Sequence, residues 1–244
     1  MFNQTQVRIK AAIDNLLGIQ INLRSRHGHY DCHDIKRSGS QISVIFDVGA
    51  HTGESALKFS FAFPKARIYC FEPVRATFEK LKRNLAGYKK IICHNLAFGS
   101  SDGKATVYLT ERSTNNSLLR PEAFVGSESV AVRTLDGFTA ENQIGRIDLL
   151  KVDTEGFDLE VLKGARNMLS GRQIPFVITE IGFHPQDTTR ALFDDVRAYL
   201  LALGYAVFGI YDQQPEWSGE KRLRFANACF CKESALVSRG QADI

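Results

Sequence analysis

The 244-residue chain lacks several features that would have restricted its function from the outset. No stretch approaches the run of about 18 uninterrupted apolar residues that a membrane-spanning helix needs. The formal net charge of +4 comes from scattered Lys and Arg with no run of five or more, so the charge does not indicate a nucleic-acid partner. Residues 1–6 show no basic segment followed by an apolar core. We therefore expect a cytoplasmic protein without a membrane span and without bound nucleic acid.

Cysteine is scarce and odd in number, which argues against a disulfide framework. Most of the five cysteines lie in apolar, strand-like runs, where they act as small buried hydrophobes in a reducing compartment. Two groups of residues contain potential zinc ligands, but neither has the ligand spacing of a common zinc site, so we predict no metal site. We interpret the group near residue 30 as a polar loop. The two groups are His27, His29, Cys32 and His33, and the pair Cys229 and Cys231.

The chain also lacks the G-x-G-x-x-G pattern of dinucleotide-binding loops. Residues 44–54 instead read Val-Ile-Phe-Asp-Val-Gly-Ala-His-Thr-Gly-Glu, an apolar strand that enters a turn with Gly49 and Gly53 and then a helix. A continuous apolar run is typical of a strand buried on both faces, and Gly49 lets the backbone lie close to a ligand. This turn predicts a site for a nucleoside that carries no pyrophosphate.

Residues 67–73 read Arg-Ile-Tyr-Cys-Phe-Glu-Pro, which predicts the end of a second strand. In an open parallel sheet this strand ends beside the first. An acidic residue roughly 20 positions after the glycine turn can then accept hydrogen bonds from a ribose diol. We interpret Glu72 as that residue. The alternative is a surface carboxylate before a proline turn.

The rest of the chain alternates strand and helix patterns, which predicts right-handed crossovers and a parallel sheet covered on both faces. We expect an N-terminal helical extension over residues 1–40 that contains an amphipathic helix over 4–20, a domain over 41–233, and a tail over 234–244. Within the domain, period-two alternation at 105–110 and 129–134 predicts a β-hairpin inserted near 104–134. Further strands are expected at 90–93, 146–152, 175–180, 205–210 and 225–231.

Further motifs follow in a fixed order: Asn95-Leu-Ala97, Val132-Arg-Thr-Leu-Asp136, Leu150-Lys-Val-Asp153-Thr-Glu155-Gly156-Phe157 and Glu160-Val-Leu-Lys-Gly164-Ala165. Together with the glycine turn and the Phe-Glu-Pro motif, the series resembles the FkbM family of class I methyltransferases over roughly residues 44–211. The resemblance implies a Rossmann-like α/β fold with a seven-stranded, mostly parallel sheet whose last strand is antiparallel. It also implies S-adenosyl-L-methionine as cofactor. The reaction expected from it is O-methylation of a hydroxyl on a sugar, glycan or secondary metabolite.

The resemblance places the cofactor-binding residues on three loops. The glycine turn would line the methionine end of the donor, Glu72 would bind the ribose, and the loop over 95–97 would line the adenine. The expected set is Asp47, Gly49, His51, Thr52, Gly53, Glu72, Asn95 and Ala97.

Candidate catalytic groups lie after the fourth and fifth predicted strands, at the sheet edge where ligands bind in such folds. Asp153 and Glu155 are candidates to orient the donor or to take a proton, and His184 is a candidate base. The alternatives are ordinary: Asp153 or Thr154 would cap a helix, and His184 would be a solvated loop residue. Together with Glu180, the two carboxylates could also hold a divalent cation, although the sequence lacks a decisive cluster.

Two other functions remain open from the sequence. A nucleic-acid methyltransferase usually carries an Asn-Pro-Pro-Tyr-like turn after the fourth strand, and the corresponding turn here is Asp153-Thr-Glu155-Gly156. The second alternative is a protein that binds S-adenosylmethionine without transferring its methyl group. The amphipathic segment over 4–20 is a candidate contact for a homo-oligomer.

Overall fold

A computed structural model describes residues 31–187, 189–215 and 222–232 of the chain. The amphipathic helix expected over 4–20, His27, His29 and the tail over 234–244 lie outside the described residues. The first described helix, α2, covers Asp31–Arg37.

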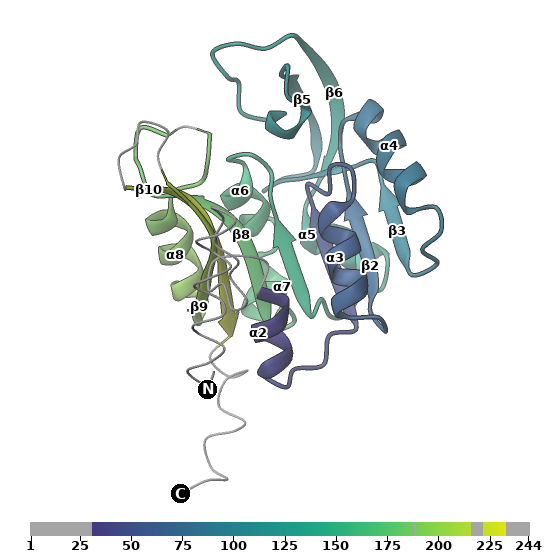
Figure 1. Cartoon of the computed structure of the whole chain (residues 1–244), viewed down its shortest axis with the longest axis vertical. Helices are drawn as coiled ribbons and strands as arrows, with labels where there is room; N and C mark the ends of the chain where they lie inside the picture. Colours follow the sequence, from purple (N-terminus) through teal and green to yellow (C-terminus); the bar gives the residue numbers. More distant parts are fainter. Residues whose placement is uncertain (1–30, 188, 216–221, 233–244) are drawn as a thin grey trace, which may run out of the picture.

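A seven-stranded sheet forms the centre of the molecule (Figure 1). Its strand order is β3-β2-β1-β7-β8-β10-β9, and β10 runs antiparallel to both of its neighbours while the other pairs are parallel. This confirms the predicted mostly parallel sheet with an antiparallel last strand. The strands are β1 Val44–Val48, β2 Arg67–Phe71, β3 Ile91–His94, β7 Leu149–Val152, β8 Phe176–Gly182, β9 Tyr205–Pro215 and β10 Leu223–Lys232.

Helices cover both faces of this sheet because alternate strand residues point to opposite sides. In β1, Ile45 packs into one apolar cluster, and Phe46 and Val48 pack into the other. The Ile45 side is covered by α2, α3 Glu54–Ala62 and α4 Arg75–Leu85. The opposite side is covered by α5 Leu135–Glu141, α6 Asp158–Lys163, α7 Arg166–Ser170 and α8 Phe193–Ala202.

The apolar spacing over residues 157–169 predicts one helix, but the structure has two. The helix α6 ends at Lys163 and α7 starts at Arg166. The carboxylate of Asp136 accepts hydrogen bonds from the backbone N–H groups of Asn167 and Met168 at 2.8 and 3.0 Å, so it caps the first turn of α7 from a distant part of the chain. The periodicity carries no trace of this distant cap.

The predicted hairpin is present, and it forms a second, smaller sheet over the carboxyl edge of the main one (Figure 1). It consists of β4 Ala97–Phe98, β5 Gly103–Leu109 and β6 Gly126–Arg133, in the order β4-β6-β5. The segment between β5 and β6 folds back on β5, where Tyr108 and Ser117 exchange backbone hydrogen bonds of 2.9 and 3.3 Å. This connection, with the short helix η1 Ser113–Asn115, is thereby held over the edge of the main sheet.

The strand order reverses at β1, which has β2 on one side and β7 on the other. In open α/β sheets, ligands bind outside the carboxyl ends of the strands at such a reversal. Among the described residues, none of the helices has the length and apolar character needed to cross a membrane.

Candidate functional site

The turn after β1 is shaped by two glycines with left-handed backbone conformations. At Gly49, φ is +80°, and an added Cβ would lie 1.8 Å from the backbone oxygen of Asp153. At Gly53, φ is +96°, and a Cβ would lie 2.9 Å from the side chain of Leu85 on α4. Gly49 therefore lets the turn pass against the end of β7, and Gly53 lets it pack on a helix. Gly49 also lines the inner pocket and the side hollow described below, so the approach to a ligand inferred from the sequence stays a prediction.

Glu72 lies at the end of β2 with its carboxylate buried beneath this turn. Its two oxygens accept hydrogen bonds from the backbone N–H groups of His51, at 3.1 Å, and Val74, at 2.9 Å. Burial raises the pKa of Glu72 to about 7, although the two N–H donors act in the opposite direction. Each carboxylate oxygen can accept more than one hydrogen bond, so Glu72 can also receive hydroxyl donors.

A pocket that we call the inner pocket opens between this carboxylate and the hairpin, with a cavity volume of about 70 Å³. Gly49, His51, Glu72 and Asp153 form its polar side, and Ser113, Thr114, Asn116, Ser117, Thr154 and Glu155 also line it. Its apolar walls come from Val48, Pro73, Val74, Leu96, Ala97, Phe98, Val107 and Leu118.

Four residues predicted to bind the cofactor do not line the inner pocket: Asp47, Thr52, Gly53 and Asn95. The side-chain amide of Asn95 donates to the backbone oxygens of Glu72, at 2.9 Å, and Pro73, at 2.7 Å. Asn95 therefore fixes the turn that carries Glu72. Ala97, by contrast, lies in the wall as predicted.

A second hollow, which we call the side hollow, adjoins the inner pocket beside the glycine turn. His51 lines both, and its ring Nε2 lies 2.9 Å from the Ser113 hydroxyl on the hairpin connection. Burial lowers the pKa of His51, so the ring is neutral at pH 7. Thr52 lines only the side hollow, with its hydroxyl 3.3 Å from His51 Nδ1.

A buried lysine that the sequence analysis missed lies beneath the side hollow. Lys151 donates to Asp153 Oδ2 at 2.8 Å and lies 3.8 Å from Asp47 Oδ1. Asp47 is fully buried, and among the described residues neither of its oxygens has a hydrogen-bond partner. Burial raises the pKa of Asp47 to about 6, against the attraction of Lys151. A buried charged side chain inside a strand is the signal that could have identified Lys151, since lysine is seldom buried without a partner.

Glu155 joins the inner pocket to a wider outer groove. It lines the inner pocket, the side hollow and this groove, and its φ of +50° places a non-glycine residue in the left-handed region. Such strain is concentrated at functional sites. Burial, together with the nearby charge of Asp153, raises the pKa of Glu155 to about 7.

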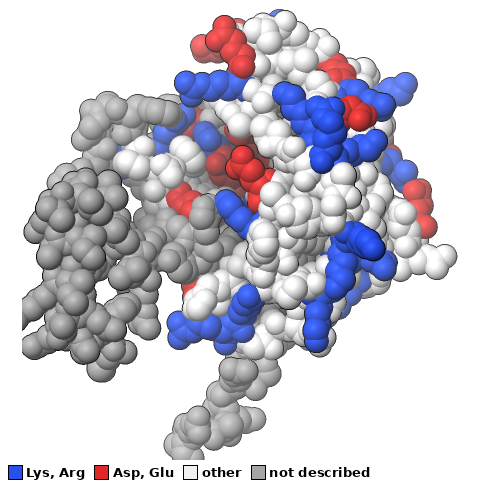
Figure 2. Space-filling view, turned by 45° about the vertical axis from the view of Figure 1, so that its right-hand side comes forward, with Lys and Arg blue, Asp and Glu red and all other residues white. Residues whose placement is uncertain are grey.

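Glu180 lies beside Glu155 at the end of β8 and takes part in an ion pair. Its Oε2 lies 2.7 Å from Arg190 Nε, while Arg190 Nη2 lies 4.0 Å from Glu155. Burial raises the pKa of Glu180 to about 8. One carboxylate oxygen from each of Asp153, Glu155 and Glu180 lies within 4.8 Å of the other two, a spacing that could hold a metal ion. Figure 2 shows acidic side chains gathered in a hollow of this face, with Lys and Arg side chains around it.

His184 is not brought to this cluster. It follows β8, and it lines neither the inner pocket, the side hollow nor the outer groove. Its Nε2 is buried without a hydrogen-bond partner among the described residues. The helix cap considered for Asp153 or Thr154 is absent, because Phe157 is the N-cap of α6 and no side chain caps this helix. Asp158 Oδ2 accepts hydrogen bonds from the Thr154 hydroxyl, at 3.0 Å, and from the Thr154 backbone N–H, at 3.3 Å, and so ties the turn after β7 to the start of α6.

The raised pKa values predict that the free protein loses stability in mild alkali. The values in the folded protein are about 7 for Glu72 and Glu155 and about 8 for Glu180, each above the ordinary 4.5. A carboxyl group whose pKa is raised by folding stabilises the folded state at low pH, and this contribution is lost as pH rises through the folded value. His51 and His94 have lowered pKa values and are neutral in both states above pH 7, so they do not offset the loss.

We expect the Tm of the free protein to fall by about 5 °C between about pH 7 and pH 8.5, measured by scanning calorimetry. The Glu180→Gln variant removes the group with the highest of these values, so its Tm should change less over the same interval. A Tm that stays constant or rises with pH in the unsubstituted protein would contradict the assignment of raised pKa values to these carboxylates.

The strand order, the antiparallel last strand and the pocket at the ends of β1, β2 and β7 define a Rossmann-like methyltransferase fold. A family model described as the methyltransferase FkbM domain matches residues 47–207. The chain belongs to the FkbM methyltransferase family. The FkbM methyltransferase structure from Methylobacillus flagellatus has a similar fold, with a TM-score of 0.52 at 19% identity over 77% of this chain and 44% of that chain.

Three curated relatives match parts of the chain. The hexuronic acid methyltransferase AglP of Haloferax volcanii is 31% identical over 152 residues, which is 61% of this chain and 61% of AglP. The methyltransferase sdnD of Sordaria araneosa is 31% identical over 169 residues, covering 54% of this chain and 64% of sdnD. The 2-O-methyltransferase NoeI of Sinorhizobium fredii is 25% identical over 171 residues, covering 62% of this chain and 70% of NoeI. The chain thus spans less than two thirds of the first two relatives.

Proposed function

We propose that this protein is an S-adenosylmethionine-dependent O-methyltransferase that acts on a hydroxyl of a sugar, glycan or secondary metabolite. The single observation that carries the proposal is the position of Glu155, which lines both the inner pocket and the outer groove. A group at that junction can reach a donor in one and an acceptor in the other. The names of two relatives, a hexuronic acid methyltransferase and a 2-O-methyltransferase, support a sugar as acceptor.

The residues of the inner pocket fit an adenosyl donor in two respects, and Asp47, buried beside Lys151 of the side hollow, fits it in a third. Apolar side chains such as Val74, Leu96 and Phe98 suit the flat base. Glu72 offers carboxylate oxygens to the ribose hydroxyls. The buried carboxylate of Asp47, which lacks a hydrogen-bond partner among the described residues, suits the amino group of a methionine moiety.

When bound, S-adenosylmethionine supplies a methyl group activated by a positively charged sulfur. The protein has to align the acceptor, exclude water and accept a proton. Lys151 holds Asp153 in place through their 2.8 Å hydrogen bond, and the hairpin connection shields the pocket from solvent. Glu155 is the group that takes up the proton of the acceptor hydroxyl. A pKa of about 7 leaves it able to do so near neutral pH.

Calorimetric titration with S-adenosylmethionine and with S-adenosylhomocysteine tests the first half of this proposal. A labelled-methyl assay over a panel of sugars, glycans and secondary metabolites tests the second half. Saturable binding together with labelled product is the expected outcome. Binding without product from any acceptor would favour a donor-binding protein without transfer activity, and flat titrations with both compounds would overturn the proposal.

The Glu72→Ala variant should bind S-adenosylhomocysteine at least about 100-fold more weakly, because it loses the acceptor of the ribose hydroxyls. It should also lower the Tm, since the backbone N–H groups of His51 and Val74 lose their partner. The matched control is Glu79→Ala, on the exposed side of α4, which should leave both quantities unchanged. An unaltered affinity in folded Glu72→Ala protein would remove Glu72 from the donor site.

A further inference from the structure

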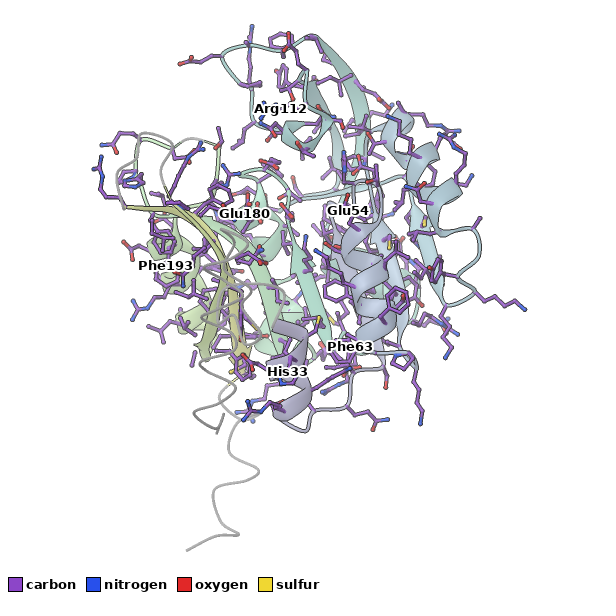
Figure 3. The ribbon with its side chains drawn as sticks, in the orientation of Figure 1. His33, Glu54, Phe63, Arg112, Glu180 and Phe193 are labelled. Carbon is purple, nitrogen blue, oxygen red and sulfur yellow. The ribbon has the colours of Figure 1, made fainter. Side chains whose placement is uncertain are left out.

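The outer groove lies between the hairpin connection and the edge of the main sheet, and it is where an acceptor would bind. Ser117 and Glu155 line both this groove and the inner pocket. Its far walls come from the β5–β6 connection on one side and from segments 189–190 and 224–225 on the other. In Figure 3, Arg112 lies on that connection, above the sheet edge that carries Glu180. The chemistry of these walls therefore bears on the nature of the acceptor.

Four arginines line the groove, and they divide into two kinds. Arg190 and Arg224 on the sheet side are held by carboxylates. Arg190 Nε lies 2.7 Å from Glu180, and Arg224 Nε lies 3.2 Å from Asp187. The guanidinium of Arg190 also lies 3.8 Å from the centre of the Phe225 ring. Their charges are balanced within the protein.

Arg112 and Arg120 on the hairpin side are different. Neither has a carboxylate within ion-pair distance among the described residues, and both are exposed. Arg120 is positioned over aromatic rings, 5.5 Å from the centre of Phe124 and 6.0 Å from that of Tyr108. Among the described residues, the carboxylates that line the groove are Glu111, which is exposed, and Glu155. The hairpin side of the groove thus presents two guanidinium groups available to a ligand.

The same wall is unusually apolar for a surface segment. Leu119, Phe124 and Val125 are 39%, 40% and 68% exposed, and all three line the groove. Aromatic and aliphatic side chains beside a guanidinium suit a ligand with an apolar ring face and an attached anion. The planar guanidinium fork matches the geometry of carboxylate and phosphate oxygens.

We propose that the outer groove binds its acceptor through an oxyanion, a carboxylate or a phosphate, which is held by Arg112 and Arg120. The acceptor of this protein is then an acidic or phosphorylated sugar, bound with its ring against Phe124 and a hydroxyl toward Glu155. This inference rests on the proposed methyltransferase function for the identity of the groove as the acceptor site.

Calorimetric titration of the full-length protein tests the proposal, with and without saturating S-adenosylhomocysteine. The probes are D-glucuronate, glucose 1-phosphate and the neutral control D-glucose. At least one anion should bind saturably and at least about 10-fold more tightly than glucose. The stronger of the two anions distinguishes a carboxylate from a phosphate acceptor. Glucose binding as tightly as both anions, or no anion binding up to about 10 mM, overturns the inference.

Substitution of the two hairpin-side arginines tests whether they bind the anion. Arg112→Gln and Arg120→Gln should each weaken binding of the preferred anion about 10-fold, with unchanged affinity for S-adenosylhomocysteine. The matched control is Arg197→Gln on α8, an exposed arginine outside the groove. A double variant that keeps the preference for the anion overturns the assignment. Anion binding in a protein that fails to bind S-adenosylhomocysteine would retain the anion site and refute the proposed function, so the two failures are distinguishable.

Discussion

The Glu155→Gln variant is expected to transfer methyl groups about 100- to 10,000-fold more slowly than the unsubstituted protein in single-turnover assays. Gln has nearly the same shape as Glu but cannot accept a proton. Of the described residues that line the three cavities, Glu155 is the one that borders the inner pocket, the side hollow and the outer groove. Its affinity for S-adenosylhomocysteine should stay within about threefold, because the loss falls on the chemical step. Quenched-flow measurement with a labelled donor gives the rate, and calorimetry gives the affinity.

The pH dependence gives an independent reading of the same residue. Burial raises the pKa of Glu155 to about 7. The fraction of Glu155 in the carboxylate form, and with it the transfer rate, should therefore increase as the pH rises through about 7 and level off at higher pH. The Glu155→Gln variant should lose this dependence. A variant with the full rate, or with an unchanged pH profile, would exclude Glu155 as the base.

Glu180→Gln is the matched control, because it makes the same change in a neighbouring carboxylate. Glu180 is held by Arg190 at 2.7 Å and lines none of the three cavities, so we expect less than a tenfold effect on the rate. Asp153 is also a weaker candidate for the base, since its Oδ2 accepts a hydrogen bond from Lys151 at 2.8 Å. If Glu180→Gln proved the slower of the two variants, the proton would be assigned to Glu180.

The main sheet was predictable because its strands are continuous apolar runs separated by helical patterns. The strands predicted to open residues 44–54 and residues 67–73, for example, are present as β1 and β2. The break between α6 and α7 was not predictable. It depends on Asp136, which caps α7 from about 30 positions earlier in the chain, and local periodicity contains no information on such a contact.

The candidate site was predicted best where a residue type and its position in a strand coincide. Glu72, His51 and Ala97 line the inner pocket as expected from their motifs. Asn95 belongs to a motif too, but its amide supports the backbone at Glu72. The outer groove could not be predicted, since it forms only when the hairpin connection folds back over the sheet edge. The arginines on its sheet side follow those on its hairpin side by about 70 to 110 positions in the chain.

The Gly49→Ala variant is expected to lose more stability than any other single substitution considered for this site. An added Cβ would lie 1.8 Å from the backbone oxygen of Asp153, and the φ of +80° is itself unfavourable for alanine. Gly49 directly follows β1 and Asp153 directly follows β7, two paired strands in the middle of the main sheet, so neither backbone segment can move without disturbing the end of the β1–β7 pairing. We expect a loss of more than about 3 kcal/mol in the free energy of unfolding.

Gly87→Ala is the matched control, because no atom lies within 4 Å of its added Cβ and its φ is not in the left-handed region. Urea unfolding of both variants measures the difference, and calorimetry with S-adenosylhomocysteine shows whether the surviving folded protein still binds. If Gly49 serves to pack the turn against β7, stability and binding should fall together, because Asp153 and the turn residue His51 both border the inner pocket. A Gly49→Ala protein of normal stability that had lost only binding would instead favour the interpretation that this glycine makes room for the ligand.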